Sequence, residues 1–489
     1  MRNRYFRNIQ GRLKIICVRF NIILSKNKES HSRPGTILLT TLVFGAIAIT
    51  MIFNGLAVFG VMENRAVKFK HNSEIAFQIA EAGIEYYRWH LAHNSTDYTD
   101  GTGLPGPYTR DYQDKNGTVI GKFILDITPP SFGSTVVTIT STGYALEQPN
   151  TRRKIQARLG FPSLADYAFL TNSDIWVGDT EVIHGKLHAN GGIRFDGMDD
   201  ALITSAKETY VCKPIFGSGC NNTVKPGIWG SGGPQEFWKF PMPAFDFNAI
   251  TMDLSNIKSG AQNGGFYRSS SGAYGYHIKF KDNSTFDLYK VTALKPLPPP
   301  GYGKDVDGSK HYESYDIKTE TLLGNYNNPN NGLIFIEDQV WAEGTVKGRV
   351  TVGSGKFPVN ITTNTSIIIP NNILYTVKDG TDALGLIAQK HILLPRYSPN
   401  IMEIDAAVIA QNGSAQRFYY SGNILDSLTI YGSVVSNGIW TWSWVTQGGS
   451  IVSGYRNTNT TYDANLNYNP PPSFPVGTEY HLLSWREIK

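Results

Sequence analysis

Charge, cysteine and catalytic motifs are all scarce in this chain of 489 residues. Charged residues make up 17% of it, against about 25% in an ordinary globular protein. The three cysteines, Cys17, Cys212 and Cys220, are too few for a disulfide framework or a four-ligand zinc site. The 49 glycines and 12% aromatic residues favour β-structure with a sizeable core and exclude a disordered chain.

No linear signature of catalysis is present. The sequence lacks a G-x-S-x-G elbow, an H-E-x-x-H motif, a Walker A loop and a G-x-G-x-x-G after a strand. Its acidic stretches also lack the spacing of a calcium loop. The sequence therefore predicts a protein that is not an enzyme, with no catalytic residues, no cofactor and no metal.

Positive charge is concentrated at the N terminus. Residues 1–35 hold nine Lys or Arg and one acidic residue, a net charge of +8, whereas the whole chain carries only +5. The remainder is therefore at −3 and has no basic excess. Because nucleic-acid binding depends on basic surface, the sequence predicts no nucleic-acid partner.

A run of 27 uncharged residues follows this leader, from Thr36 to Met62. As a helix it would be about 40 Å long, enough to cross a hydrocarbon core of about 30 Å. The basic leader on its N-terminal side predicts a cytoplasmic N terminus by the positive-inside rule. We therefore expect a single-pass membrane protein that contacts the lipid membrane through 36–62 and has an extracytoplasmic body.

The helix is expected to continue beyond the membrane to about residue 93. No proline lies between 63 and 93, and apolar residues recur there at spacings of three and four. This is the pattern of an amphipathic helix. The recurring residues are Ala76, Ala80, Ile84, Tyr87 and Leu91.

Residues 94–162 are predicted to form a small antiparallel sheet. A polar connection over 94–116 is followed by strand-like runs over 118–128, 135–141 and 152–159, which end at proline or glycine. We expect this sheet to pack on the amphipathic half of the helix.

The order of basic leader, glycine, uncharged helix and β-rich body resembles that of type IV pilins. The stretch Ile79-Ala80-Glu81-Ala82-Gly83 is similar to the AEAG stretch of PilX-like minor pilins. Three further stretches carry the same resemblance, namely Thr138–Gly143, Arg152–Ala157 and the tail that contains Pro470–Pro475 and Ser484–Glu487.

The resemblance implies that a prepilin peptidase cuts after Gly35 and leaves Thr36 as the new N terminus. It also implies that the N-terminal helix packs with other pilin subunits, and that the body serves pilus assembly or adhesion at the cell surface or on a pilus. The fifth mature residue in the family is often Glu, but here it is Thr40. This difference leaves open a membrane-tethered surface protein or adhesin that enters no filament. A tethered glycan-active β-helix enzyme is a second alternative.

The region 163–489 has short β-branched runs separated by Gly, Asn or Asp. A short pattern that ends in Asn-Gly recurs at 188–191, 409–413 and 435–438. Stacked turns of parallel strands need short runs of this kind with a tight corner after each. We therefore predict a β-solenoid, that is, a parallel β-helix. A sandwich or jelly roll is the alternative. Residues 198–330 interrupt the pattern and are predicted to be a long insertion.

Two features of the body are candidate sites. Cys212 and Cys220 enclose seven residues, which predicts a local disulfide in an exported chain, whereas Cys17 in the leader is expected to stay reduced. Trp440, Trp442 and Trp444 alternate, so on a strand they would share one face. That face would be either an aromatic surface for sugar rings or a partner, with surface glycans as candidate ligands, or a stacked row inside the sheet.

Overall fold

The computed structural model describes residues 34–489 apart from 248, 447 and 478, so Cys17 and nearly all of the predicted leader lie outside the described residues. The chain divides between Ile75 and Ala76 into two compact units. One helix, α2 (Pro34–His93), contains the division. It confirms the long helix predicted for 36–93.

A five-stranded antiparallel sheet opens the second unit, in the order β1-β2-β3-β4-β34. The small antiparallel sheet that the sequence predicted is therefore confirmed, with two more strands than expected. The strands are β1 (Tyr108–Gln113), β2 (Val119–Thr128), β3 (Val136–Ala145), β4 (Arg152–Gly160) and β34 (His481–Ile488).

The last strand of this sheet comes from the C-terminal end of the chain. β34 pairs antiparallel with β4, with Trp485 opposite Ala157. The predicted boundary of the body at 163–489 is therefore corrected at its end, because 481–488 belong to the small sheet. Without β34, the backbone groups of β4 would form an open edge.

The second half of α2 packs on this sheet through the predicted apolar stripe, whose residues Ala76, Ala80, Ile84, Tyr87 and Leu91 are all buried. Glycine makes the approach close. A Cβ at Gly143 would lie within 3 Å of the backbone of Ala76 and Ala80, and a Cβ at Gly83 would meet Ser141. The backbone of the helix therefore lies very close to the backbone of the sheet.

The body is a coil of parallel strands, which confirms the predicted β-solenoid-like fold. Its main ladder is parallel throughout and joins ten strands. From one end to the other these are β15 (Trp238–Lys239), β11 (Ile203–Ser205), β8 (Lys186–Ala189), β5 (Tyr167–Thr171), β31 (Ile424–Ser436), β29 (Ile401–Ala410), β27 (Ala383–Ala388), β24 (Arg349–Ser354), β22 (Leu333–Ile336) and β16 (Phe266–Arg268).

A second parallel ladder uses the first halves of β31 and β29. It also contains β10 (Met198–Asp199), β7 (Glu181–His184), β33 (Ile451–Thr461), β26 (Ile373–Tyr375) and β23 (Val340–Val346).

The third face of the coil is in two parts, which are separate sheets among the described residues. One part joins β23 to β25 (Ile367–Ile368), β28 (Ile392–Leu393) and β30 (Ala415–Gln416). The other joins β6 (Ile175–Val177), β9 (Ile193–Phe195) and β14 (Ile228–Trp229).

The order of the main ladder shows that the chain enters the coil in its middle. β5 lies between β8, which follows it closely in sequence, and β31, which comes from the last turns of the coil. We call this junction of β5 with β31 the seam, and it pairs Phe169 with Val434. The seam leaves β5 with a strand on both sides.

Residues 198–330, predicted as one insertion, instead contribute to both ends of the coil. β10, β11 and β15 extend one end, whereas β16 and β17 (Gly275–Lys281) extend the other. β18 (Thr285–Leu294) and β21 (Ile317–Asn327) continue β17 as an antiparallel sheet. The local strands in this range are the hairpin of β12 (Thr209–Cys212) and β13 (Thr223–Pro226), and the pair β19 (Gly303–Lys304) and β20 (Lys310–His311).

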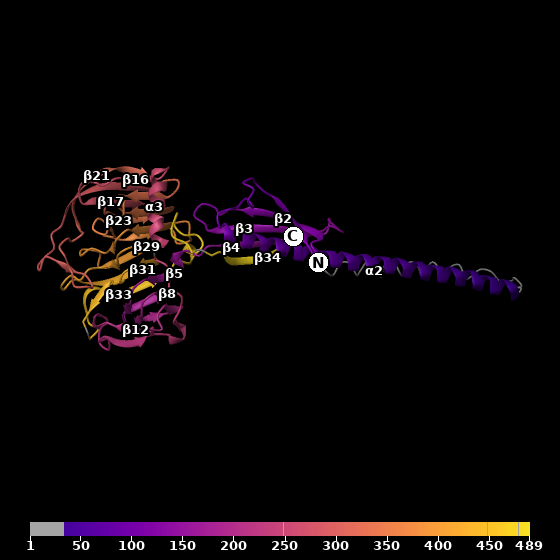
Figure 1. The fold of residues 1–489 in the computed structure, drawn as a ribbon, viewed down its shortest axis with the longest axis horizontal. Coiled ribbons are helices and arrows are strands. Elements are labelled where there is room, and N and C mark those ends of the chain that lie inside the picture. The colour runs from indigo at the N-terminus through magenta and orange to yellow at the C-terminus, as the bar shows by residue number, and fades with distance from the viewer. Residues whose placement is uncertain (1–33, 248, 447, 478) are drawn as a thin grey trace, which may run out of the picture. The chain divides into compact units, whose positions relative to one another are not determined.

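The remaining elements are short or lie on the surface of the coil. Helix α3 (Ala249–Gln262) packs its buried residues Leu254 and Ile257 with Phe335 and other outward residues of the main ladder, and Figure 1 shows it beside these strands. The other elements are β32 (Ser443–Val445) and the 3-10 turns Leu164–Asp166, Pro214–Phe216, Gln235–Phe237 and Ala464–Leu466.

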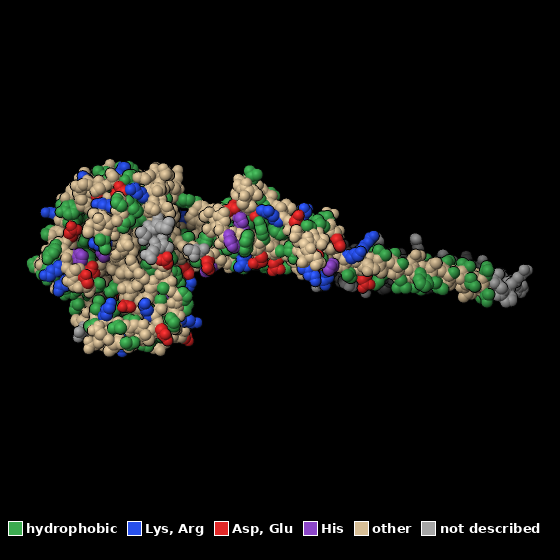
Figure 2. Space-filling model, viewed as in Figure 1, with side chains coloured by type: hydrophobic (Ala, Val, Ile, Leu, Met, Phe, Trp, Pro, Cys, Tyr) green, Lys and Arg blue, Asp and Glu red, His purple; other side chains and the backbone are tan. Residues whose placement is uncertain are grey.

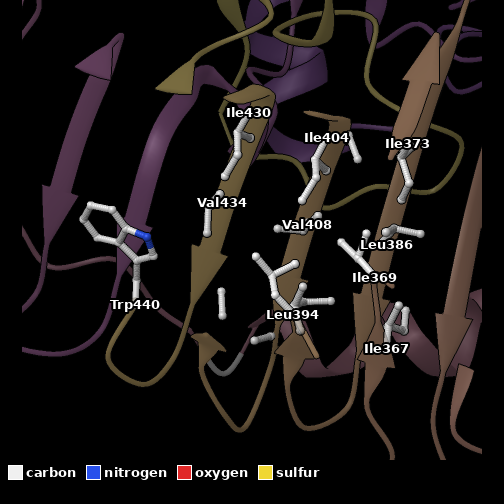
Figure 3. Packing of buried hydrophobic residues seen from close by; sticks show 14 of the residues in the cluster. Ile367, Ile369, Ile373, Leu386, Leu394, Ile404, Val408, Ile430, Val434 and Trp440 are labelled. Carbon is white, nitrogen blue, oxygen red and sulfur yellow. The ribbon is translucent and has the colours of Figure 1, made fainter. Parts of the chain in front are cut away.

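The core of the coil consists of rows of aliphatic side chains, one per turn. Val434, Val408 and Leu386 form one row in register, and Ile430, Ile404 and Ile373 form another. Figure 3 shows both rows pointing into the coil. Because each turn supplies Val, Ile or Leu at the same place, every rung buries its apolar side against its neighbours.

Candidate functional site

The first half of α2 exposes large apolar side chains. From Ile37 to Met62 they are exposed, with Phe44 at 71%, and Figure 2 shows hydrophobic side chains along this part of the helix. The helix is long and apolar enough to cross a membrane, and none of its most apolar window is buried. An exposed surface of this kind is stable in lipid and unstable in water. The helix therefore has the properties of a single membrane anchor.

Three threonines of this segment, Thr40, Thr41 and Thr50, hydrogen-bond within the helix. The Thr40 hydroxyl donates to the Ile37 carbonyl at 3.0 Å, and the Thr50 hydroxyl to the Ala46 carbonyl at 2.6 Å. Their hydrogen-bonding groups therefore do not oppose burial in hydrocarbon. Gly35 and Thr36, the predicted cleavage site, form the first turn of α2 together with Pro34.

A cleft of about 320 Å³ lies where the third face of the coil is interrupted. Residues 439–445 of the last turn form one side, and β6, β9 and the loop between Cys212 and Cys220 form the other. We call it the tryptophan cleft. Its main lining side chains are Trp176, Glu181, Arg194, Asp196, Phe216, Trp440, Trp442 and Trp444.

All three tryptophans of the predicted row line this cleft, although only Trp444 lies on a regular strand, β32. Trp440 stacks on Phe169 at 3.9 Å between ring centroids. Trp444 is half-buried, and its indole N–H donates to the Arg417 carbonyl at 2.8 Å. The row therefore combines buried packing with one partly open indole.

Two of these indoles have an unused donor. Trp440 and Trp442 are only 5% and 2% exposed, and neither ring N–H has a hydrogen-bond acceptor among the described residues. A buried donor without an acceptor costs about 1–3 kcal/mol. Neither nitrogen has accessible surface, so these two indoles pack in the interior of the coil and offer no donor to the cleft.

Opposite the row, an ion pair is held against Trp176. Arg194 Nε lies 2.7 Å from Asp196 Oδ2, and the guanidinium stacks over the Trp176 ring at 4.4 Å. Trp176 Nε1 donates to the same carboxylate oxygen at 2.8 Å. Burial alone would raise the pKa of Asp196, but the hydrogen bonds from Ser231 and Trp176 outweigh it and lower that pKa. Asp196 is therefore ionised and fully engaged.

The disulfide loop completes this side of the cleft. Cys212 and Cys220 are bonded to each other, and Arg194 Nη1 donates to the carbonyls of Phe216 and Ser218 inside the loop, at 2.6 and 2.7 Å. The tryptophan row and the loop that the cysteine pair closes thus line one cleft, the loop through Ile215, Phe216 and Ser218.

Glu181 is the most deeply buried acid of the cleft. It is 7% exposed, and its carboxylate accepts a hydrogen bond from the Thr458 hydroxyl. Burial raises the pKa of Glu181 to about 8, so the group is mostly protonated at neutral pH and can donate a hydrogen bond.

Sequence reasoning did not find Trp176, Glu181, Arg194 or Asp196 as members of a site. Trp176 and Arg194 sit in runs that the sequence marks only as strands, and no local pattern links them to the tryptophan row. The parallel pairing of β6 with β9, Trp176 opposite Arg194, is the signal that joins them. Among the described residues, no group of three or more His, Cys, Asp or Glu could hold a metal ion.

Comparisons with known proteins give distant likeness to solved structures and nothing nearer. No protein-family model and no curated protein matches the chain. Among solved structures, the crystal structure of the competence-associated pilin ComZ from Thermus thermophilus is similar at 14% identity, with a TM-score of 0.29, over 85% of this chain and 97% of that chain. A TM-score of this size carries no argument about fold or function.

Proposed function

We propose that this chain is a non-enzymatic, PilX-like minor pilin that is anchored by α2 and displays the β-coil outside the membrane for pilus assembly or adhesion. The observation that carries the proposal is the small sheet. It packs on the amphipathic half of an otherwise exposed apolar helix, an arrangement expected of a pilin. The inserted coil is then the displayed part.

Processing by a prepilin peptidase is part of this proposal. Cleavage after Gly35 would remove the +8 leader and leave Thr36 as the N terminus. Mass spectrometry of the protein from native membranes should give a chain that begins at Thr36. A Gly35→Leu variant should keep Met1, whereas Gly45→Ala, at a glycine with open space around it, should be processed normally. An intact Met1 in the wild type would refute processing.

Filament incorporation has one rival, favoured by a specific observation. Thr40 occupies the place where the family often has Glu, and its hydroxyl bonds within its own helix. It supplies no carboxylate for a neighbouring N-terminal amine, which a buried charge of that kind needs. This favours a surface protein that stays in the membrane, or a single copy at a filament end.

Immunogold labelling of sheared pili separates these roles. Label at filament ends is the expected result, since a coil of this size repeated along a shaft would crowd its neighbours. Label confined to cell bodies would contradict the pilin role. Pull-down of the full-length protein from native membranes should recover other pilin subunits or a prepilin peptidase.

A further inference from the structure

The face of the small sheet that points away from α2 is basic. Ile155 and Ala157 of β4 are fully buried, and Arg153 lies over the Phe77 ring of α2 at 5.2 Å, so the odd-numbered residues of β4 face the helix. The even-numbered residues point outward, beside residues 484, 486 and 488 of β34. These outward positions hold no acid, and their cations are Arg152, Lys154, Arg158 and Arg486. We call these four residues the basic face.

No carboxylate within the sheet neutralises these charges. Among the described residues, neither Lys154 nor Arg158 forms an ion pair, and Arg486 Nη2 donates to the neutral Gln156 at 2.8 Å. Elsewhere on the outward side, Lys122 is balanced by Asp111 at 2.9 Å. A surface with such an excess of positive charge is complementary to a partner that presents several anionic groups.

The exposed side of α2 carries the complementary charge. Glu74, Glu81 and Glu85 are exposed and lie seven and four residues apart, so they form one stripe along the helix, on the side away from the sheet. The stripe continues to Trp89, which is 60% exposed. Arg88 pairs with Glu85 at 2.8 Å, whereas Glu74 and Glu81 have no ion pair among the described residues. We call the three glutamates and Trp89 the acidic stripe.

The spacing of charges on the two surfaces is similar. At about 1.5 Å per residue, the carboxylates of the acidic stripe are separated by about 6 and about 10 Å along the helix. Along β4, the separations between Arg152, Lys154 and Arg158 are about 7 and about 13 Å. Flexible Lys and Arg side chains bridge the difference, so a helix laid along β4 brings each carboxylate within reach of one cation. Trp89, beyond Glu85, then lies beside Arg152, whose planar guanidinium stacks well on an indole.

We propose that the basic face binds the acidic stripe of a second copy of this chain. Because the two surfaces point in opposite directions, the contact is head to tail. Copies that α2 anchors in one membrane have the same orientation, so movement within the membrane plane brings the stripe of one copy to the face of the next without rotation. The contact needs two copies and no filament. It therefore goes beyond the display role proposed above, and the two proposals can fail separately.

A charge swap in the full-length protein tests this contact. One double variant, Lys154→Glu with Arg158→Glu, reverses the basic face, and the other, Glu81→Lys with Glu85→Lys, reverses the acidic stripe. Each protein is labelled with donor or acceptor dye at the N-terminal amine and reconstituted in vesicles of zwitterionic lipid, which offer no net anionic headgroup to the basic face. Energy transfer between copies measures their association.

The wild type should associate, and each variant alone should associate at least tenfold more weakly, because like charges then meet. A mixture of the two variants should associate to within about threefold of the wild type, because each acidic surface again finds a basic one. Lys318→Glu with Lys347→Glu reverses two exposed lysines elsewhere. It is the matched control and should associate like the wild type.

Four outcomes would overturn the inference. The first is a wild type whose copies stay apart. The second is association that both reversed variants keep, as contact through the membrane segment alone would give. The third is a mixture of variants that associates no better than either one. The fourth is loss of a different pilin subunit from native-membrane pull-down with the reversed basic face while wild-type copies stay apart, which would make that subunit the occupant.

Discussion

The small antiparallel sheet and the parallel coil bury their strands against different partners. The sheet packs one face on α2, through glycines that bring the backbones together. The coil packs its strands on further turns of itself, through rows of Val, Ile and Leu. The comparison teaches that one chain uses two kinds of core. The first is sensitive to added volume at a glycine, and the second is sensitive to removed volume in a row.

Phe169→Ala at the seam should have the largest effect on stability. The side chain is 1% exposed, lies between the rows of β8 and β31, and stacks on Trp440. Removal of a buried Phe typically costs about 3–5 kcal/mol. Denaturant unfolding should show this loss in the coil, while Leu386→Ala gives the reference cost for a position of the same row away from the seam. A loss below about 1 kcal/mol would mean that the seam is not packed like the rest.

Gly143→Ala should damage the small sheet instead. Its new methyl group would lie within 3 Å of the α2 backbone at Ala76 and Ala80, and overpacking of this kind costs about 1–3 kcal/mol. Limited proteolysis should show β1–β4 cut while the coil remains protected. Gly178→Ala, where nothing lies within 4 Å, is the control. Equal protection of both variants would contradict the close approach.

Glu181→Gln should show how the stability of the coil depends on pH. Buried Asp100 beside the small sheet pairs with Arg110 at 2.7 Å, whereas no ion pair is seen for Glu181 among the described residues. The pKa of Glu181 is raised to about 8 in the folded protein, against 4.5 ordinarily. Between these values the unfolded chain releases the proton and the folded chain keeps it, so the wild type loses stability as pH rises.

The Gln variant has no such proton and should lack this loss. Relative to Gln, the wild type should lose about 2 kcal/mol between pH 5.5 and pH 7, from about 1.4 kcal/mol per pH unit. Urea unfolding of both proteins at the two pH values measures the difference. A difference that does not change with pH would show that the carboxyl is ionised in the folded coil.

Glu487→Gln should have the smallest effect. Glu487 and Arg153 form an ion pair across β34 and β4, but both side chains are partly exposed, and such pairs contribute little. The strand is held by its backbone pairing and by Trp485, which packs edge-on against Phe77 at 5.9 Å. Thermal unfolding should be unchanged by Glu487→Gln and lowered by Trp485→Ala. A large effect of Glu487→Gln would reverse this ranking.

The sequence predicts the fold where the cause is local. An uncharged run and a three-four spacing are enough for α2, and repeated short apolar runs with Asn-Gly corners are enough for a coil. The strand β34 could not be assigned to the small sheet, because its partner β4 lies more than 300 residues away and its composition gives no sign of pairing.

The same reasoning applies to the candidate site. The alternation of Trp440, Trp442 and Trp444 identifies them as one group, and the spacing of Cys212 and Cys220 identifies another. That the tryptophan row and the loop closed by this disulfide line one cleft, together with Arg194 and Glu181, depends on the interrupted third face and on the seam. These follow from the order of turns in space, which no local pattern records.

The seam also constrains when the protein can fold. Because β5 is synthesised long before β31, and β4 long before β34, each early strand has one unpaired edge until most of the chain has been made. Contacts between residues so far apart in the sequence form slowly, and unpaired strand edges can pair with other chains. Synthesis of β31 and then of β34 therefore completes the two β-regions, and a chain that stops before β31 would leave an unpaired strand edge in each of them.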